Sequence, residues 1–296
     1  MTAAEEPPVE EKILQFPEQY AAAASQGIPG AQEASLRKAP PKPKTGVMIA
    51  TTKRHWPNPE EWAKMSKEKM AEFLEREVPQ IGRALRELAG HPDYVFEFAV
   101  AVGGHCRAKN TLVHDFLNKT NHTWLQWWDD DLYPEGTSVS QAILRLLSHR
   151  QAYVGAPYCK RAKRPMWAAT FMPTAVEEHG VQFDLLQMAE LAGGATLVHR
   201  KCYTELRRIF AEEVSAEAAN TIEYRDRDTG EKMHAFYQQM VVGKDLLSED
   251  YFMNYLMRCA KIGILMDTKL PCKHRDSDGT FYPAEFPAMP GVGETP

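Results

Sequence analysis

Residues 123–132 read TWLQWWDDDL, and this stretch decides the fold that the sequence predicts. Its first six residues are mostly apolar, which is typical of a buried strand. Three aspartates follow without a break. A strand that ends in carboxylates places them at the carboxyl edge of a sheet, where open α/β sheets bind their ligands. In an extended chain Asp129 and Asp131 point to one side, and Asp130 points to the other.

The sequence on either side of this stretch alternates between strands and helices. Short apolar runs predict strands at residues 47–50, 94–102, 153–156 and 167–172. Helical patterns lie between them, at 60–88 with an interruption near Pro79, at 107–117 and at 138–148. This alternation is typical of a parallel sheet covered by helices. The expected fold class is therefore α/β, with a mixed, mostly parallel central sheet flanked by helices.

The second half of the chain has a less regular pattern. It predicts strands at 195–199 and 264–267, a helix at 201–213, and two strands within 224–237 that a turn at 228–231 separates. A further helix follows Ser248, a good N-cap residue, and stops at Gly263. Glu249 and Asp250 fall in its first turn, where carboxylates suit the helix dipole.

Composition and charge exclude several classes of protein. The chain has 296 residues, of which 44% are hydrophobic and 25% charged, as in an ordinary globular protein. A net charge of -5 argues against a protein that coats nucleic acid through a global positive field. The five cysteines form no C-x-x-C pair, which favours a reducing compartment. Without a long apolar run or a signal-like N-terminus, we expect a cytoplasmic chain with no integral membrane segment.

Three segments divide the chain. Residues 1–44 are rich in proline and alanine and end in a basic run, which predicts a disordered tail. Residues 45–283 carry the strand and helix patterns and are predicted to form one domain. Residues 284–296 are predicted to be a flexible C-terminal tail.

Four groups of polar residues are candidates for chemistry. Asp129 and Asp131 are suited to hold a hard divalent cation together with substrate phosphates. The carboxylates in 248–250 are suited either to deprotonate an acceptor hydroxyl or simply to cap a helix. His274 gains meaning only beside a metal, where imidazole among oxygen ligands suits Mn²⁺. The basic run 160–164 either faces phosphates or is an exposed loop.

The order of these motifs resembles that of the GT-A glycosyltransferases, in particular the small family-two-like enzymes of phages and bacteria. The resemblance covers roughly residues 45–283. It is carried by the R-x-x-N helix start at 107–110, the D-x-D position at 129–131, the V-G-x-P-Y-x-K segment at 154–160, the glycine-containing segment at 192–200 and the S-E-D-Y segment at 248–251. Gly193 and Gly194 match no phosphate-loop motif and indicate only that the backbone turns or is closely approached there.

The resemblance implies a GT-A fold and a transferase that moves a sugar from a nucleotide diphosphate, typically UDP, to an acceptor hydroxyl. It implies Mn²⁺ or Mg²⁺ as cofactor, held by Asp129, Asp131 and His274. Asp250, or failing it Glu249, is the implied catalytic base, and one base without an enzyme nucleophile implies inversion. The implied contacts to the nucleotide sugar are Thr51, Thr52, Lys53, Arg107, Asn110, Asp129, Asp130 and Lys160.

The acceptor and two other classes of function stay open at this point. The acceptor is a glycan or a hydroxymethylated base in phage DNA, and the oligomeric state is not indicated. A nucleotidyltransferase also uses a metal and an α/β sheet, but its glycine-rich phosphate loop is missing near the first strand. A catalytically inactive nucleotide-sugar-binding protein is the third alternative.

Overall fold

A large sheet forms the centre of the structure, and most of its strands are the apolar runs of the sequence. The computed structural model describes residues 44–53, 64–102, 104–160, 165–171, 184–212, 222–227, 229–276, 279–283 and 286–287, all within one unit, Lys44–Pro296. Within them, the sheet has eight strands in the order β2-β1-β3-β8-β5-β13-β7-β6. These are β1 (Thr45–Lys53), β2 (Tyr94–Val102), β3 (Trp124–Trp127), β5 (Tyr153–Gly155), β6 (Ala169–Phe171), β7 (Leu185–Leu191), β8 (Thr196–His199) and β13 (Ile264–Asp267).

The pairing of these strands confirms a mixed, mostly parallel sheet. β1 is parallel to both β2 and β3, and β5 is parallel to β13. β8 lies antiparallel between β3 and β5, and β7 lies antiparallel between β13 and β6. Six of the eight described strands therefore run in one direction, and only β7 and β8 run against them.

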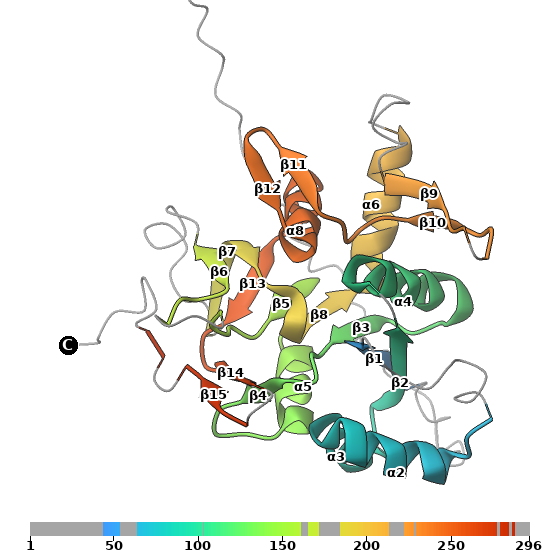
Figure 1. The fold of residues 1–296 in the computed structure, drawn as a ribbon, viewed down its shortest axis with the longest axis vertical. Helices are drawn as coiled ribbons and strands as arrows, with labels where there is room; N and C mark the ends of the chain where they lie inside the picture. The colour runs from blue at the N-terminus through green and yellow to red at the C-terminus, as the bar shows by residue number, and fades with distance from the viewer. Residues whose placement is uncertain are drawn as a thin grey trace, which may run out of the picture. The chain divides into compact units, whose positions relative to one another are not determined.

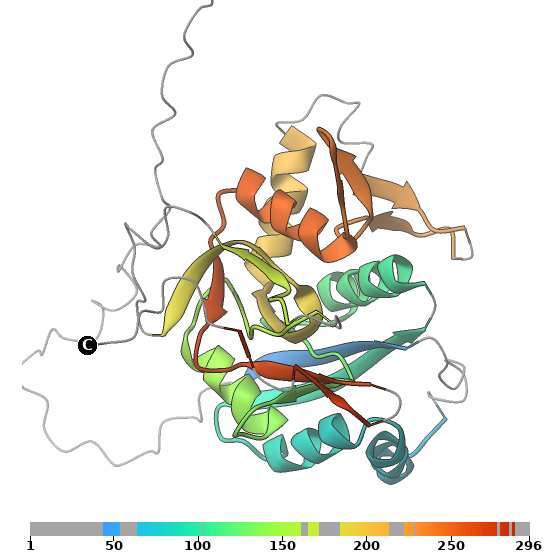
Figure 2. The same cartoon turned by 60° about the vertical axis from the view of Figure 1, so that its left-hand side comes forward.

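Helices cover both faces of this sheet, as Figures 1 and 2 show. One face carries α4 (His105–Lys119), α6 (Arg200–Glu212) and α8 (Glu249–Cys259), and the other carries α3 (Pro79–Leu88) and α5 (Val139–Ser148). α2 (Lys67–Glu77) packs on α3. Successive residues of β1 feed the two cores in turn: Met48 and Ala50 face the first, Val47 and Ile49 the second. The strand's period of two thus builds a core on each face.

The helix boundaries follow local chemistry, with one exception. Ser138 caps α5 through a complete capping box with Gln141, and Pro79 opens α3 at a position where its missing N–H costs nothing. Ser248 stands at the N-cap of α8 but makes no side-chain capping bond, which corrects the expectation from its sequence. α8 ends at Cys259 rather than Gly263, because Lys261 already adopts a positive φ of 55°.

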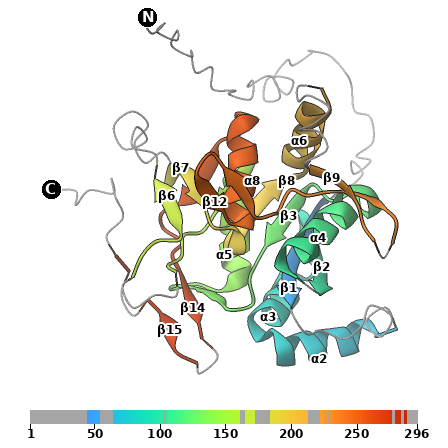
Figure 3. The same cartoon turned by 45° about the horizontal axis from the view of Figure 1, so that its top comes forward.

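Three small sheets extend the central one. The hairpin of β9 (Glu223–Arg225) and β10 (Lys232–His234) lies beside α4, and β11 (Met240–Val242) pairs with β12 (Asp245–Leu247) ahead of α8 (Figure 3). β4 (Leu132–Pro134), which follows the three aspartates, pairs with β14 (Cys272–Arg275), and β14 pairs with β15 (Phe281–Tyr282). The last sheet joins the aspartate segment to the C-terminal part of the chain.

Some predictions fall on residues that the structure does not describe. They are the N-terminal tail apart from Lys44, the basic residues 161–164, and most of the C-terminal tail. Among the helices that are described, none combines the length and the apolar character that a membrane crossing needs.

Candidate active site

The parallel strands β1, β2 and β3 end at one edge of the sheet, and the aspartates lie there. α4 begins at this edge directly after β2. The Asp129 N–H donates to the carbonyl of Gly194 at 2.7 Å, while Leu132 N–H donates back to the carbonyl of Asp129 at 3.2 Å. Asp130 and Asp131 therefore lie in a turn. The expected alternation of an extended chain does not apply to them, because the chain bends there to enter β4.

Two carboxylates pack against the glycine pair Gly193–Gly194. A Cβ added to Gly193 would lie 2.8 Å from Cγ of Asp250, and one added to Gly194 would overlap a carboxylate oxygen of Asp129. The Gly193 N–H also donates to Asp250 Oδ2 at 2.9 Å. Consecutive Cα atoms are only about 3.8 Å apart. The two aspartates are thus close neighbours although 121 positions separate them in the sequence.

Lys109 forms an ion pair with one of these carboxylates, that of Asp250. Its side chain is 2% exposed, and its Nζ donates to Asp250 Oδ1. Nζ also lies 3.9 Å from Glu249 Oε1 and faces the rings of Trp127 and Tyr237, at 5.8 and 5.2 Å from their centres. We call Lys109, Asp129 and Asp250, with Gly193 and Gly194, the carboxyl-edge cluster.

Burial and charge move the two aspartate pKa values in opposite directions. Burial raises the pKa of Asp129 above its ordinary value, and the charge of Asp250 adds to this although Lys109 opposes it. Burial also acts to raise the pKa of Asp250, but the charge and hydrogen bond of Lys109, with the Gly193 N–H, lower it below its ordinary value. Burial acts to lower the pKa of Lys109, but Asp250 and Asp129 raise it. Asp250 therefore stays ionised and Lys109 stays protonated, so the two form an ion pair.

His105 connects the end of β1 to the start of α8. Its Nδ1 lies 3.1 Å from the hydroxyl of Thr52, and its Nε2 lies 3.4 Å from Glu249 Oε1. Thr51, the preceding residue of β1, is 1% exposed, and its hydroxyl has no hydrogen-bond partner among the described residues. Lys53 closes β1, and its side chain is not described. Thr52 and Glu249, both predicted site residues, thus come together through a histidine.

His274 lies on β14 and reaches the cluster through Tyr158. Its ring meets that of Tyr158 edge-on at 4.8 Å between centres, and the Tyr158 hydroxyl accepts from the Gly194 N–H at 3.1 Å. The pairing of β4 with β14 sets His274 opposite Leu132, and the Arg275 N–H donates to the carbonyl of Asp131 at 2.7 Å. The backbones of the Asp131 and His274 segments are therefore neighbours.

A divalent cation at this edge would need ligand atoms from the aspartate segment and from His274. Within the described ranges, no three His, Cys, Asp or Glu side chains gather as a ready metal site. Mg²⁺ is commonly held by one or two carboxylates together with substrate phosphates, so a full protein cage is not required. His274 Nδ1 lies 2.7 Å from the carbonyl of Cys159, which can only accept. Nδ1 must carry the proton and Nε2 the lone pair, which is the tautomer of a metal ligand. An imidazole and a carboxylate, such as those of His274 and Asp131, are donor types that such an ion accepts beside a diphosphate.

The remaining predicted residues occupy varied positions. Arg107 binds Asp226 of the β9–β10 hairpin through two hydrogen bonds of 3.2 Å. The buried Asn110 exchanges two hydrogen bonds with the backbone of Tyr237, at 2.8 and 2.9 Å, which gives it a structural role. The carbonyl of Asp130 accepts from Gln80 at 2.5 Å. Lys160 is exposed, with Nζ 5.8 Å from the ring of Tyr251, the neighbour of Asp250. Lys160 is therefore close to the cluster, whereas Arg107 and Asn110 are engaged elsewhere.

Sequence reasoning missed Lys109 and His105. Both lie on α4, four positions apart, so they share one face of the helix. The available signal was a helix that starts directly after a strand and carries two basic residues at this spacing. It indicates that these side chains face the ligand-binding edge.

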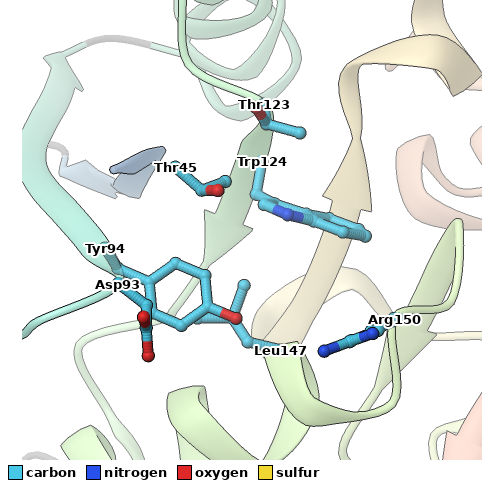
Figure 4. A pocket seen from close by; sticks show the side chains of 7 residues that line it. All are labelled: Thr45, Asp93, Tyr94, Thr123, Trp124, Leu147 and Arg150. Carbon is cyan, nitrogen blue, oxygen red and sulfur yellow. The ribbon is translucent and has the colours of Figure 1, made fainter. Parts of the chain in front are cut away.

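A separate hollow of about 520 Å³ lies at the opposite edge of the sheet (Figure 4). We call it the amino-edge hollow, because Thr45, Tyr94 and Trp124 line it and are the first residues of β1, β2 and β3. Asp93, Thr123, Leu147 and Arg150 complete its lining. None of the predicted site residues is among these, so the cluster and the hollow are two distinct places.

Comparison with known proteins identifies no family. No protein-family model matches the chain, and no curated protein matches its sequence. A197 from STIV is 11% identical over 79% of this chain and 92% of that chain, with a TM-score of 0.39. GalNAc-T7, solved with UDP, GalNAc and Mn²⁺, is 10% identical over 79% of this chain and 44% of its own, with a TM-score of 0.39.

A Bacillus anthracis chain designated a glucose-1-phosphate thymidylyltransferase, solved with a sucrose, is 9% identical over 77% of this chain and 90% of its own, with a TM-score of 0.29. All three TM-scores are low, so these likenesses decide nothing about the activity of this chain.

Proposed function

We propose that this chain is a glycosyltransferase that moves a sugar from a nucleoside diphosphate, UDP most typically, to an acceptor hydroxyl. The observation that carries the proposal is the hydrogen bonding of the Asp250 carboxylate. Its carboxylate is held by Lys109 on one oxygen and by the Gly193 N–H on the other. A carboxylate has about four acceptor positions, so this one keeps room for a substrate hydroxyl.

The roles of the residues follow from their positions. Asp250 takes the proton of the acceptor hydroxyl as it attacks, and its lowered pKa keeps it ionised for that step. Thr51 and Thr52 end β1 at the same edge, where a nucleotide is expected to bind. With a single base and no enzyme nucleophile assigned, the displacement is inverting.

Asp131 and His274 are the residues that we assign to a divalent cation, with Asp129 as the third predicted ligand. When bound, Mn²⁺ or Mg²⁺ neutralises the charge that develops on the leaving diphosphate. Lys160 lies near the start of α8 and adds positive charge for the same phosphates. The acceptor that we propose is a glycan or a hydroxymethylated base in DNA.

The experiment is a turnover assay with a panel of UDP-, GDP- and TDP-sugars in Mn²⁺. The nucleotide products are separated by chromatography, and acceptors are followed by their gain in mass. We expect release of a nucleoside diphosphate, much reduced in Asp250→Asn and less reduced in Glu249→Gln. A parallel assay with a nucleoside triphosphate and a sugar 1-phosphate tests the other transferase class, because release of pyrophosphate there would indicate a nucleotidyltransferase instead. Binding that stabilises the fold without any release would indicate an inactive binding protein.

A further inference from the structure

Lys109 is a buried cation whose position demands an explanation. An ammonium group that leaves water loses several kcal/mol of hydration unless it is paired. Lys109 lies one helical turn after the start of α4, on the side of the helix that is buried. Its side chain is 2% exposed, and the rings of Trp127 and Tyr237 form an aromatic wall beside it.

The aromatic wall is itself rigid. Trp127 Nε1 donates to the hydroxyl of Tyr203 at 3.3 Å, and the hydroxyls of Tyr203 and Tyr237 lie 3.0 Å apart. Cations are attracted to the faces of such rings. The wall therefore fixes where the ammonium lies.

The two acids of the cluster need a cation between them. Asp129 and Asp250 pack against consecutive glycines, and both are partly buried. Two neighbouring carboxylates repel each other strongly in a low-dielectric site when both are ionised. The Lys109 ammonium attracts both, with Asp250 as its hydrogen-bonded partner.

We propose that Lys109 is a positioning residue, an internal counter-ion that holds Asp129 and Asp250 side by side and sets the direction in which Asp250 presents its oxygen to the acceptor. The catalytic part of this inference rests on the proposed function. The counter-ion part rests only on the fold and is measurable without any substrate.

The test removes the ammonium and then returns it from solution. Lys109→Ala leaves room for n-propylammonium, which has the same atoms as the lysine side chain beyond Cβ. n-Propanol, which lacks the charge, is the chemical control. Lys119→Ala is the matched control variant, because Lys119 lies on the same helix but its pair with Asp115 is exposed.

Two readouts are measured on the full chain. Lys109→Ala is expected to lower Tm by about 5 °C or more and nucleoside diphosphate release by at least about 100-fold, with the KM for the donor within about threefold. n-Propylammonium is expected to raise Tm and to recover at least about tenfold in rate, whereas n-propanol recovers neither. Lys119→Ala is expected to respond to neither compound.

Several outcomes overturn the inference. Wild-type Tm and release in Lys109→Ala would do so, as would equal effects of n-propanol and n-propylammonium. If Lys109→Ala does not fold, adding Asp250→Asn should restore folding by removing the unpaired charge, and continued failure to fold would contradict the counter-ion role. If the wild type releases no nucleotide, the proposed function fails, while the Tm measurements still decide the counter-ion role.

Discussion

Asp267 and Asp250 both form ion pairs while exposing little of their side chains, and they differ in how many donors occupy their carboxylate oxygens. Asp267 is 0% exposed and accepts from Arg145 at 2.5 and 2.9 Å, from His149 at 2.7 Å and from the Lys269 N–H at 3.0 Å. These four donors fill the acceptor capacity of a carboxylate. Asp250 accepts from only two donors among the described residues, Lys109 and Gly193.

We propose that the difference separates a structural carboxylate from a reactive one. A filled carboxylate such as Asp267 fastens α5 to β13 and has no acceptor position left for a substrate. Asp250 accepts hydrogen bonds from Lys109 and from the Gly193 N–H, and it keeps further acceptor positions at the carboxyl edge. Burial and pairing alone therefore do not mark a functional acid. In this pair, the unfilled acceptor positions of Asp250 are what distinguish it from Asp267.

The substitution Asp250→Asn should have the largest effect on activity, and it tests whether Asp250 differs in role from Asp267. An amide cannot take the acceptor proton, so we expect nucleoside diphosphate release per folded molecule to fall by about 100- to 10,000-fold. The variant also loses part of the Lys109 pair, so the folded fraction is measured by circular dichroism. Release at the wild-type rate would remove Asp250 from the role of base.

Gly193→Ala tests whether the placement of the carboxylate matters. The added Cβ would meet Cγ of Asp250 at 2.8 Å and push the carboxylate aside. We expect release to fall by about 10- to 100-fold, because sub-ångström placement governs such steps. Gly263→Ala is the matched control, since nothing lies within 4 Å of its added Cβ. Equal rates in the two variants would contradict the account.

Asp267→Asn examines the structural member of the pair. The change removes the charge that Arg145 and His149 share, and we expect a loss of about 2 kcal/mol in the free energy of unfolding, measured by urea denaturation. The rate per folded molecule should stay at the wild-type value. Glu205→Gln, which breaks the exposed pair with Arg208, should cost less than about 1 kcal/mol. A large loss of rate in Asp267→Asn would place Asp267 in the site.

The smallest expected effect is a shift in pH dependence. Because the folded-state pKa of Asp250 is lowered, its ionised form persists, and its contribution to stability is lost only as the pH falls through that lowered value. Lys109→Ala removes a main cause of the lowering, so the pKa of Asp250 should rise. The acidic limb of the rate profile should then move to higher pH. An unmoved limb would show that Lys109 does not act on the base.

Much of the fold was predictable from sequence, for a physical reason. Five strands of the central sheet are apolar runs, and such a run favours burial whichever strands it pairs with. They are β1, β2, β3, β8 and β13. β4, β11, β12, β14 and β15 were missed, because each has only two to four residues and depends on a partner strand. β7 (Leu185–Leu191) was missed as well, although it has seven residues. β4, for example, exists only through its pairing with Cys272–Arg275.

The site was predictable where a motif carries it. Asp129, Glu249 and Asp250 follow sequence patterns, and the structure brings them together. Lys109 was missed because it resembles any lysine on an amphipathic helix, and its burial depends on an aspartate 141 positions later. The glycine pair indicated a close approach, but not that carboxylates make it. Long-range partners of this kind are set by the fold, and the local pattern indicates only the edge that a side chain faces.

The most direct measurement locates the donor and its metal in crystals of this chain soaked with UDP and Mn²⁺, using the anomalous signal of manganese. The account predicts a manganese peak beside Asp131 and His274, with the diphosphate at the carboxyl edge next to the carboxyl-edge cluster. Nucleotide and manganese in the amino-edge hollow, between Tyr94, Trp124 and Arg150, would contradict it.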